Sequence, residues 1–267
     1  TLNFVDMFTA ADGTPSDYRK WLSDHGHDGT VYNNPFTGKD PRLYETVLIA
    51  GDRYRTRCAE TWIDGLEHGS SANPKCATGF IIRKFLWDYN DEFLNKATNS
   101  AYIRLPELYL MYAEALNELG RSQEALSWLN KTRTRVGLPE ITLPNAAKLH
   151  SGQALPDYPE CSLKGDKYLR EEILDERARE FCFEEVRWFD IAFWKREDLM
   201  RKILYGIQIT RKSGSFEEGN LVLTYSDPSK MDQGRIWQDK FSPKWFLSAF
   251  PSDEINKGYG LVQNPGW

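Results

Sequence analysis

The sequence contains no apolar run that approaches the roughly 20 residues needed for a membrane-spanning helix. Histidine and cysteine are scarce, with four of each, and their spacing fits no zinc-binding pattern. A G-x-x-x-x-G-K phosphate loop, a dinucleotide fingerprint and a G-x-S-x-G elbow are also missing. We therefore expect no metal, no cofactor and no serine-hydrolase or nucleotide chemistry. The histidines all fall in predicted loops: His25, His27, His68 and His150.

Positive charge is not concentrated anywhere in the chain. The net charge is −5 and the isoelectric point is about 5.5, with lysine and arginine spread along the sequence. Because binding to nucleic acid requires a concentrated basic face, a nucleic-acid partner is not expected.

The few cysteines indicate little about the compartment. Cys58 and Cys76 flank a stretch rich in Gly, Ser and Asn, and they would close a surface loop as a disulfide in an oxidising setting. Cys182 lies in an apolar stripe at helical spacing and is expected to be a buried thiol.

Residues 104–136 have the pattern of two helices joined at Gly120, with Ser122 as the expected N-cap of the second. Ala113 and Ala125 take the small positions of a tetratricopeptide-type hairpin. Such repeats normally need at least about three copies to be stable, and only one is evident. We therefore predict an antiparallel helical hairpin whose outer face is apolar.

A second helical pattern covers residues 168–196, which we predict to form one long helix. Its apolar positions recur every three or four residues: Ile173, Leu174, Ala178, Phe181, Cys182, Val186, Phe189 and Phe193. Glu180, Glu184, Glu185 and Asp190 invite a glycoside-hydrolase interpretation. However, Arg177, Arg179 and Arg187 lie at ion-pairing distances along the helix, so we favour a structural role.

The rest of the chain is rich in turns. Residues 1–95 are irregular, with "LYETVLIAG" as the best strand candidate. Residues 137–160 interrupt the helices with prolines and glycines, and residues from 200 onward alternate short strand-like pieces with turns. The expected fold class is mainly α, with a hairpin, a long helix, a large loop-rich region and a few short strands.

Aromatic residues make up 13% of the sequence, and several lie in polar, turn-rich segments. A ring in such a loop can stack on the apolar face of a sugar while polar neighbours bond the hydroxyl groups. The alternative role is to pin a long loop to the body. We expect ligand at residues 12–37 and 52–78, with Trp21 and Trp62 as the leading rings. The further candidates are Tyr18, Tyr32 and Trp237, and Trp87 lies in a similar setting.

Four segments resemble the SusD/RagB family of nutrient-binding outer-membrane lipoproteins of Bacteroidetes. The first two are "NFVDMFTAADGTP" and "GKDPRLYETVL". The third is "YIRLPELYLMYAEALNELG" continuing into "REEILDERAREFCFEEVRWFDIAFWKR", and the last is "FPSDEINKGYGLVQNPGW". Together they extend over nearly the whole chain.

The resemblance implies that residues 1–267 form one compact unit, the C-terminal half of the family fold. The unit would comprise loop-rich residues 1–100, helical residues 101–200 and an irregular segment, 201–267. The N-terminal half, with most of the helical hairpins and the lipid-bearing cysteine, would lie outside this sequence.

The implied function is a non-enzymatic, surface-exposed receptor for a glycan or other nutrient at the outer membrane. Its partner would be a SusC-like TonB-dependent transporter, to which it delivers ligand. Membrane association would come only through the lipid anchor. Two other classes stay open: a protein-interaction scaffold that uses the hairpin groove, and a glycoside hydrolase.

Overall fold

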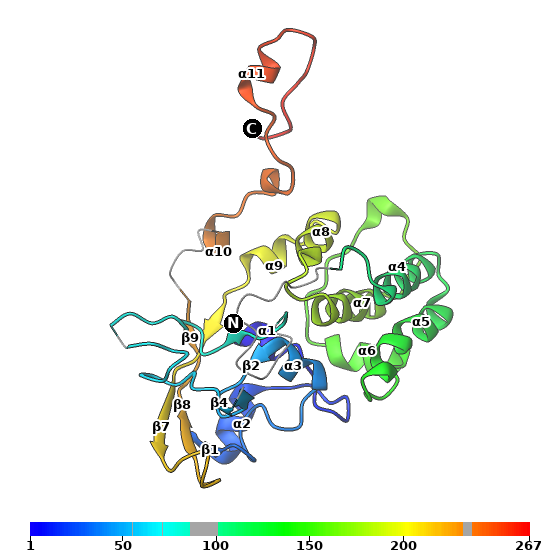
Figure 1. Ribbon diagram of the computed structural model, residues 1–267. Helices are drawn as coiled ribbons and strands as arrows, with labels where there is room; N and C mark the ends of the chain where they lie inside the picture. Colours follow the sequence, from blue (N-terminus) through cyan, green and yellow to red (C-terminus); the bar gives the residue numbers. More distant parts are fainter. Residues whose placement is uncertain (55, 71, 86–100, 232–236) are drawn as a thin grey trace.

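The computed structural model describes residues 1–54, 56–70, 72–85, 101–231 and 237–267, and the fold in these ranges is mainly helical (Figure 1). The α-helices are α1 Leu2–Val5, α2 Tyr18–His25, α3 Pro41–Thr46, α4 Leu105–Glu118, α5 Ser122–Arg135, α6 Leu143–His150, α7 Lys167–Glu180, α8 Val186–Phe193, α9 Glu197–Arg201, α10 Trp237–Lys240 and α11 Ser252–Ile255. Two 3₁₀ helices are η2 Pro159–Cys161 and η3 Pro243–Phe246. The strands are β1 Asp28–Thr30, β2 Val47–Leu48, β3 Arg53–Tyr54, β4 Arg57–Cys58, β5 Ile81–Ile82, β6 Tyr205–Gly206, β7 Ile209–Ser213, β8 Val222–Tyr225 and β9 Ser229–Lys230. The expected fold class is confirmed. No described helix has the length and apolar character needed to cross a membrane.

The predicted hairpin is present as α4 and α5, which pack against α6 and α7 on one side of the molecule (Figure 1). Ala113 and Ala125 are buried, and such small side chains let the two helices approach closely. Gly120 makes the turn with a φ of +80°. Ser122 is not the N-cap as expected, because it is the first residue of α5 and its hydroxyl donates to Asn117 Oδ1 at 2.7 Å.

The prediction of one long helix over residues 168–196 is wrong, because α7 ends at Glu180 and α8 begins at Val186. Two cationic side chains from distant segments bind backbone carbonyls at this end of α7. Lys84 Nζ donates to the carbonyl oxygens of Glu180 at 3.1 Å and Cys182 at 3.0 Å, and Arg104 Nη2 donates to that of Glu180 at 3.0 Å. These carbonyls are therefore capped from outside the helix.

The apolar face predicted for that helix is interrupted at the same place. Phe181 and Cys182 are buried as expected, but Phe189 and Phe193 on α8 are exposed. Between the two helices, Phe183 and Glu185 have left-handed backbone conformations with φ of 61° and 64°. Because this reversal rotates α8 relative to α7, the periodic stripe does not continue on one side.

The strand predicted at "LYETVLIAG" is helical in its first half. Asp40 caps α3 by accepting a hydrogen bond from the Arg42 backbone N–H at 2.9 Å, and Pro41 occupies the first turn. Only Val47 and Leu48 form a strand, β2, which pairs with β5. The helix α6 in the proline-rich segment begins in a comparable way, because the Thr142 side chain caps it.

Two of the histidines expected in loops are instead the last residues of helices, His25 in α2 and His150 in α6.

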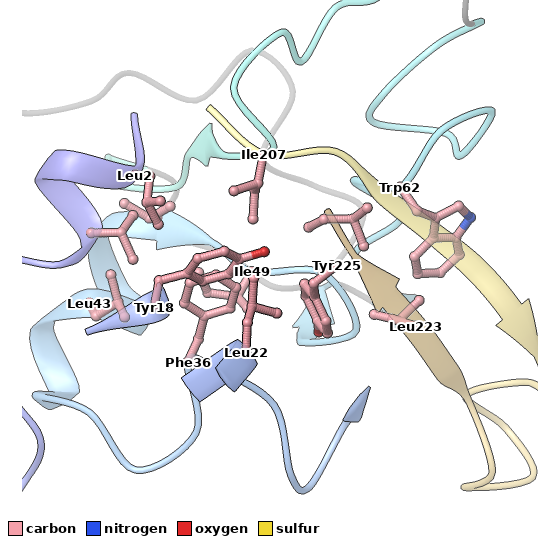
Figure 2. Close-up of a cluster of buried hydrophobic side chains, with 14 of the residues drawn as sticks. Leu2, Tyr18, Leu22, Phe36, Leu43, Ile49, Trp62, Ile207, Leu223 and Tyr225 are labelled. Carbon is pink, nitrogen blue, oxygen red and sulfur yellow. The ribbon is translucent and has the colours of Figure 1, made fainter. Parts of the chain in front are cut away.

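A second core lies under the loop-rich region, where short helices pack on an antiparallel sheet of order β1-β8-β7. Figure 2 shows Tyr18, Phe36 and Tyr225 close together in this cluster. All four cysteines lie in described residues and are free thiols, so Cys58 and Cys76 form no disulfide. Burial raises the pKa of both thiols to about 11, so both stay protonated at neutral pH.

The C-terminal segment extends away from the rest of the molecule (Figure 1). It is closed on itself by the side chains of its last residues. Gln263 bonds both the backbone N–H and the carbonyl of Phe250, at 2.8 and 3.0 Å, and Trp267 Nε1 donates to the carbonyls of Lys244 and Leu247, each at 3.0 Å.

Candidate functional site

Tyr18, predicted to extend a stacking platform, faces the core. It has no exposed surface, its ring stacks on Phe36 with centroids 5.9 Å apart, and its hydroxyl donates to the Ser226 carbonyl at 2.8 Å. Burial raises the pKa of the hydroxyl above its usual range. In this structure Tyr18 anchors α2 to the body.

Trp62 is also buried, with 6% of its surface exposed, and it lies at one side of the cluster in Figure 2. Its loop is held by a polar cluster, in which the Glu67 carboxylate accepts from Arg57 Nη1 at 2.9 Å and from the Glu60 N–H at 2.7 Å. Arg57 keeps the pKa of Glu67 below its usual value despite the opposing effect of burial. These contacts match the alternative role that the sequence left open, a ring that pins a loop.

Trp21 is partly exposed and packs against the same core cluster as Tyr18. Its ring lies edge-on to Tyr225 at 6.2 Å and stacks on His25, with centroids 4.9 Å apart and an angle of 12° between the rings. His25 Nδ1 lies 3.1 Å from the Trp21 carbonyl oxygen. One face of the Trp21 ring is therefore covered by an imidazole. Sequence reasoning missed His25, although its position four residues after Trp21 predicts this contact on a helix.

Tyr32 is the most exposed of the described candidate rings, with 76% of its surface accessible. It lies in a tight turn after β1, in which its backbone N–H and that of Asn33 donate to Thr30 Oγ1, at 3.3 and 3.1 Å. Trp237 begins α10, but its side chain lies outside what the structure describes, as does all of Trp87. The structure thus brings Tyr18 and Trp62 into the core and leaves Trp21 and Tyr32 accessible.

Polar side chains follow α2 on the edge strand of the sheet. Asp28 accepts a hydrogen bond from Thr224 Oγ1 at 2.7 Å and forms an ion pair with Lys212 on β7. Lys212 first, and then Thr224, keep the pKa of Asp28 below its usual value. Thr224 and Tyr225 alternate along β8, so these side chains lie on the face of the sheet opposite Tyr225 and are separate from the Trp21 ring, which packs against Tyr225.

The acidic residues that suggested glycoside hydrolysis are held in ion pairs at the end of α7. The Glu180 carboxylate contacts Arg42 Nη1 at 3.1 Å, Arg104 Nη1 at 2.8 Å and Arg135 Nη2 at 2.8 Å. Glu184 pairs with Lys84 and Arg104. The expected pairing with neighbours on the same helix is therefore wrong for these two acids.

Asp190 does pair as predicted, with Arg177 Nη2 at 2.9 Å. Arg179 turns instead to Glu172 and Glu176 earlier on α7, and Arg187 lies 3.8 Å from Asp175. Among the described residues, no three His, Cys, Asp or Glu side chains are grouped so that they could hold a metal ion.

A model of the SusD family matches residues 1–267, the whole chain. The chain belongs to the SusD family. A SusD-like protein of Bacteroides fragilis, whose crystal structure is known, is 26% identical and superposes with a TM-score of 0.70 over 100% of this chain. Two SusD-like proteins of Formosa agariphila, P2 and P38, are 38% identical over 96 residues and 31% identical over 98 residues.

The SusD-family relatives are longer than this chain. The matched region covers 46% of the Bacteroides fragilis protein, so the chain spans about half the length of that relative. The matches to the two Formosa agariphila proteins cover 36% of this chain and 17% of each relative. The functions of those whole proteins therefore bear on this chain only as the basis of a proposal.

Proposed function

We propose that this chain is part of a non-catalytic cell-surface receptor that binds a glycan or another nutrient. The receptor delivers its ligand to a SusC-like TonB-dependent transporter and is held at the outer membrane by a lipid anchor outside this sequence. The observation that carries the proposal is the SusD family match over the whole chain, supported by the shared fold.

The non-catalytic part of the proposal rests on the acids of α7. Glycoside hydrolysis requires two carboxyl groups, about 5–10 Å apart, that face the substrate. Glu180 is buried and contacts three arginine side chains, while Glu184 is bound by Lys84 and Arg104. Carboxylates held this way serve the fold, because they pair with cationic side chains from several segments, among them the buried guanidinium of Arg42.

We further propose that the chain is the C-terminal half of a longer protein. The outer face of α4 supports this, since Leu105, Leu108, Tyr112 and Leu119 are all exposed there. Their spacings of three, four and seven residues make a continuous apolar seam, which is the pattern of a helix that packs against another helix. Further hairpins of the family fold would cover this seam.

We place the ligand at the accessible rings, with Trp21 as the main contact and Tyr32 beside the polar turn. Replacing Trp21 with Ala should weaken glycan binding by about 1–3 kcal/mol, by analogy with base stacking on aromatic rings. That is a loss of about tenfold in affinity or more. The rest of the fold should be little changed, because Trp21 is only partly buried.

Trp62→Ala is the matched comparison, because it removes the same ring from a buried position. It should lower the melting temperature strongly while leaving affinity unchanged in the protein that remains folded. A glycan array would first identify a ligand, and calorimetry would then compare the variants. Wild-type affinity in Trp21→Ala, with a confirmed ligand, would exclude this site but not the receptor function. Failure of the whole array would count against glycans as the nutrient.

A further inference from the structure

Lys39 is a buried lysine whose amino group makes no hydrogen bond. Its side chain is 3% exposed, and Nζ has no hydrogen-bond partner among the described residues. One contact of Nζ is the ring of the buried Phe36, whose centroid is 5.5 Å away. A charged ammonium group carries three donors, and removing it from water without hydrogen bonds is costly. This setting therefore favours the neutral amine, which is the nucleophilic form of lysine.

The carboxyl group of Asp6 lies next to this amine. Asp6 Oδ1 is also buried and without a hydrogen-bond partner, and it lies 3.6 Å from Lys39 Nζ. Burial raises the pKa of Asp6 to about 6 and lowers the pKa of Lys39. Both shifts favour the uncharged forms of the two groups. A carboxylic acid and an amine held side by side are the two reactants that form an amide.

Backbone contacts hold both residues in place. Lys39 pairs with Ala10 in an isolated β-bridge, and its N–H donates to the Tyr44 hydroxyl oxygen at 3.1 Å. Asp6 ends α1, where its N–H donates to the Leu2 carbonyl oxygen at 2.9 Å. Two reacting groups that are fixed next to each other react as if each were present at a very high concentration. The fold therefore favours a reaction between these two side chains.

We propose that Lys39 and Asp6 are joined by an intramolecular isopeptide bond. The neutral amine of Lys39 attacks the carboxyl carbon of protonated Asp6 through Nζ, and a C–N bond forms. The C–OH bond of the carboxyl group then breaks, and the hydroxyl group leaves as water with one proton from the amine. An acid and an amine give an amide and water, so the step needs no oxidant and no co-reactant. The product also replaces two charged groups in the core with one neutral amide, which is less costly to bury.

The bond closes residues 6–39 into a covalent ring that contains α2. As with a disulfide, closing a ring restricts the unfolded chain and so stabilises the fold. Trp21 and Tyr32 lie within the ring, but the inference uses only the contacts of Lys39 and Asp6, so it stands whether or not ligand binds at either ring. In the linked form Asp6 no longer titrates, so its effect on the pH dependence of stability belongs to the unlinked form.

Mass spectrometry of the full chain tests for the bond directly. The intact chain should be lighter than its sequence by the mass of one water molecule. Trypsin should leave Lys39 uncut and should release a branched peptide that joins the segments containing Asp6 and Lys39. Lys212 and Asp28 are the matched control in the same digest, because they form an exposed ion pair whose charges stay hydrated, and their peptides should not be linked.

Lys39→Met and Asp6→Ala each remove one reactant, so both variants should have the full mass of their sequences. Water can also be lost through a succinimide at an aspartate that precedes glycine, and the chain has three of these: Asp12, Asp28 and Asp64. A succinimide would persist in both variants and would give no branched peptide. Three results would overturn the proposal: a wild-type chain of full mass, a loss of water that remains in Lys39→Met, or a wild-type digest in which trypsin cuts after Lys39. The wild-type digest decides the matter even where a variant folds poorly.

Discussion

Replacing Glu176 with Gln should destabilise the protein more than any exposed charge change. Glu176 is completely buried in the middle of α7, and its carboxylate lies 2.6 Å from Arg42 Nη1, 2.9 Å from Arg179 Nη2 and 3.6 Å from Arg133 Nη1. These guanidinium groups hold its pKa far below the usual range, against the opposing effect of burial. The glutamine side chain has the same shape but removes the negative charge that three buried cations share.

The loss of unfolding free energy depends on which other carboxylates the arginines still pair with after the substitution. Removing one partner of a buried ion pair typically costs about 3–5 kcal/mol, because the remaining charge is uncompensated. Here Arg42 keeps Asp40, at 2.7 Å, and Arg179 keeps Glu172, at 2.6 Å. The expected loss is therefore at the lower end, about 3 kcal/mol. For a chain of this size that lowers the melting temperature by about 6–12 °C.

Thermal and urea unfolding, followed by circular dichroism at pH 7, would measure the change. Glu124→Gln is the control, because Glu124 forms an exposed pair with Arg121 at 2.6 Å and its replacement should leave the melting temperature unchanged. A Glu176→Gln protein that melts within about 2 °C of the wild type would refute the reasoning, since such a shift corresponds to 1 kcal/mol or less. It would mean that water or the remaining carboxylates compensate the charges of the arginines.

Glu184→Gln should also lower stability, by less than Glu176→Gln, and should leave ligand binding unchanged; loss of binding at an unchanged melting temperature would contradict a structural role. Stability should rise as the pH falls from about 7 to 5, because burial raises the pKa of Asp6 and Asp52 to about 6, so their protonation favours the folded state. It should fall again below about pH 4.5, where carboxylates with lowered pKa values, such as Glu172, become protonated in the unfolded chain first. Asp52→Asn should flatten the rise between pH 7 and 5, and an unchanged urea-unfolding profile in that variant would exclude Asp52 as a source.

The hairpin was predictable because its determinants are local. Apolar residues recur at helical spacing within each helix, Gly120 provides the positive φ of the turn, and Ala113 and Ala125 are the small residues where the helices meet. By contrast, the end of α7 depends on Lys84 and Arg104, which lie 96 and 76 residues away from Glu180 in the sequence. The apolar pattern within residues 168–196 does not depend on those contacts, so it could not predict that the helix ends at Glu180.

The positions of the candidate rings were likewise only partly predictable from local spacing. Tyr18 and Leu22 are four residues apart on α2 and are buried in the core, while Trp21 packs at the edge of the core, stays partly exposed and stacks on His25, four residues later. At helical spacing all four side chains point into one sector of about 100°, so treating residues 18–25 as a helix predicts the Trp21–His25 contact but not which ring is buried. The burial of Trp62 could not be predicted from local spacing, because it belongs to a cluster that includes residues distant in sequence, such as Ile207 and Leu223.

The acids of α7 show why paired carboxylates in a sequence are an ambiguous sign of catalysis. Glu172, Glu176 and Glu180 recur every four residues, so they lie along one face of the helix. That face meets arginines from the loop and hairpin segments, including Arg42 on α3 and Arg133 and Arg135 on α5, so the acids together bind both segments to α7. A catalytic pair must instead keep its oxygens free for substrate. The partners of the carboxylates, which come from distant segments, decide between the two roles, and here they favour a helix that holds the hairpin and the loop-rich region together.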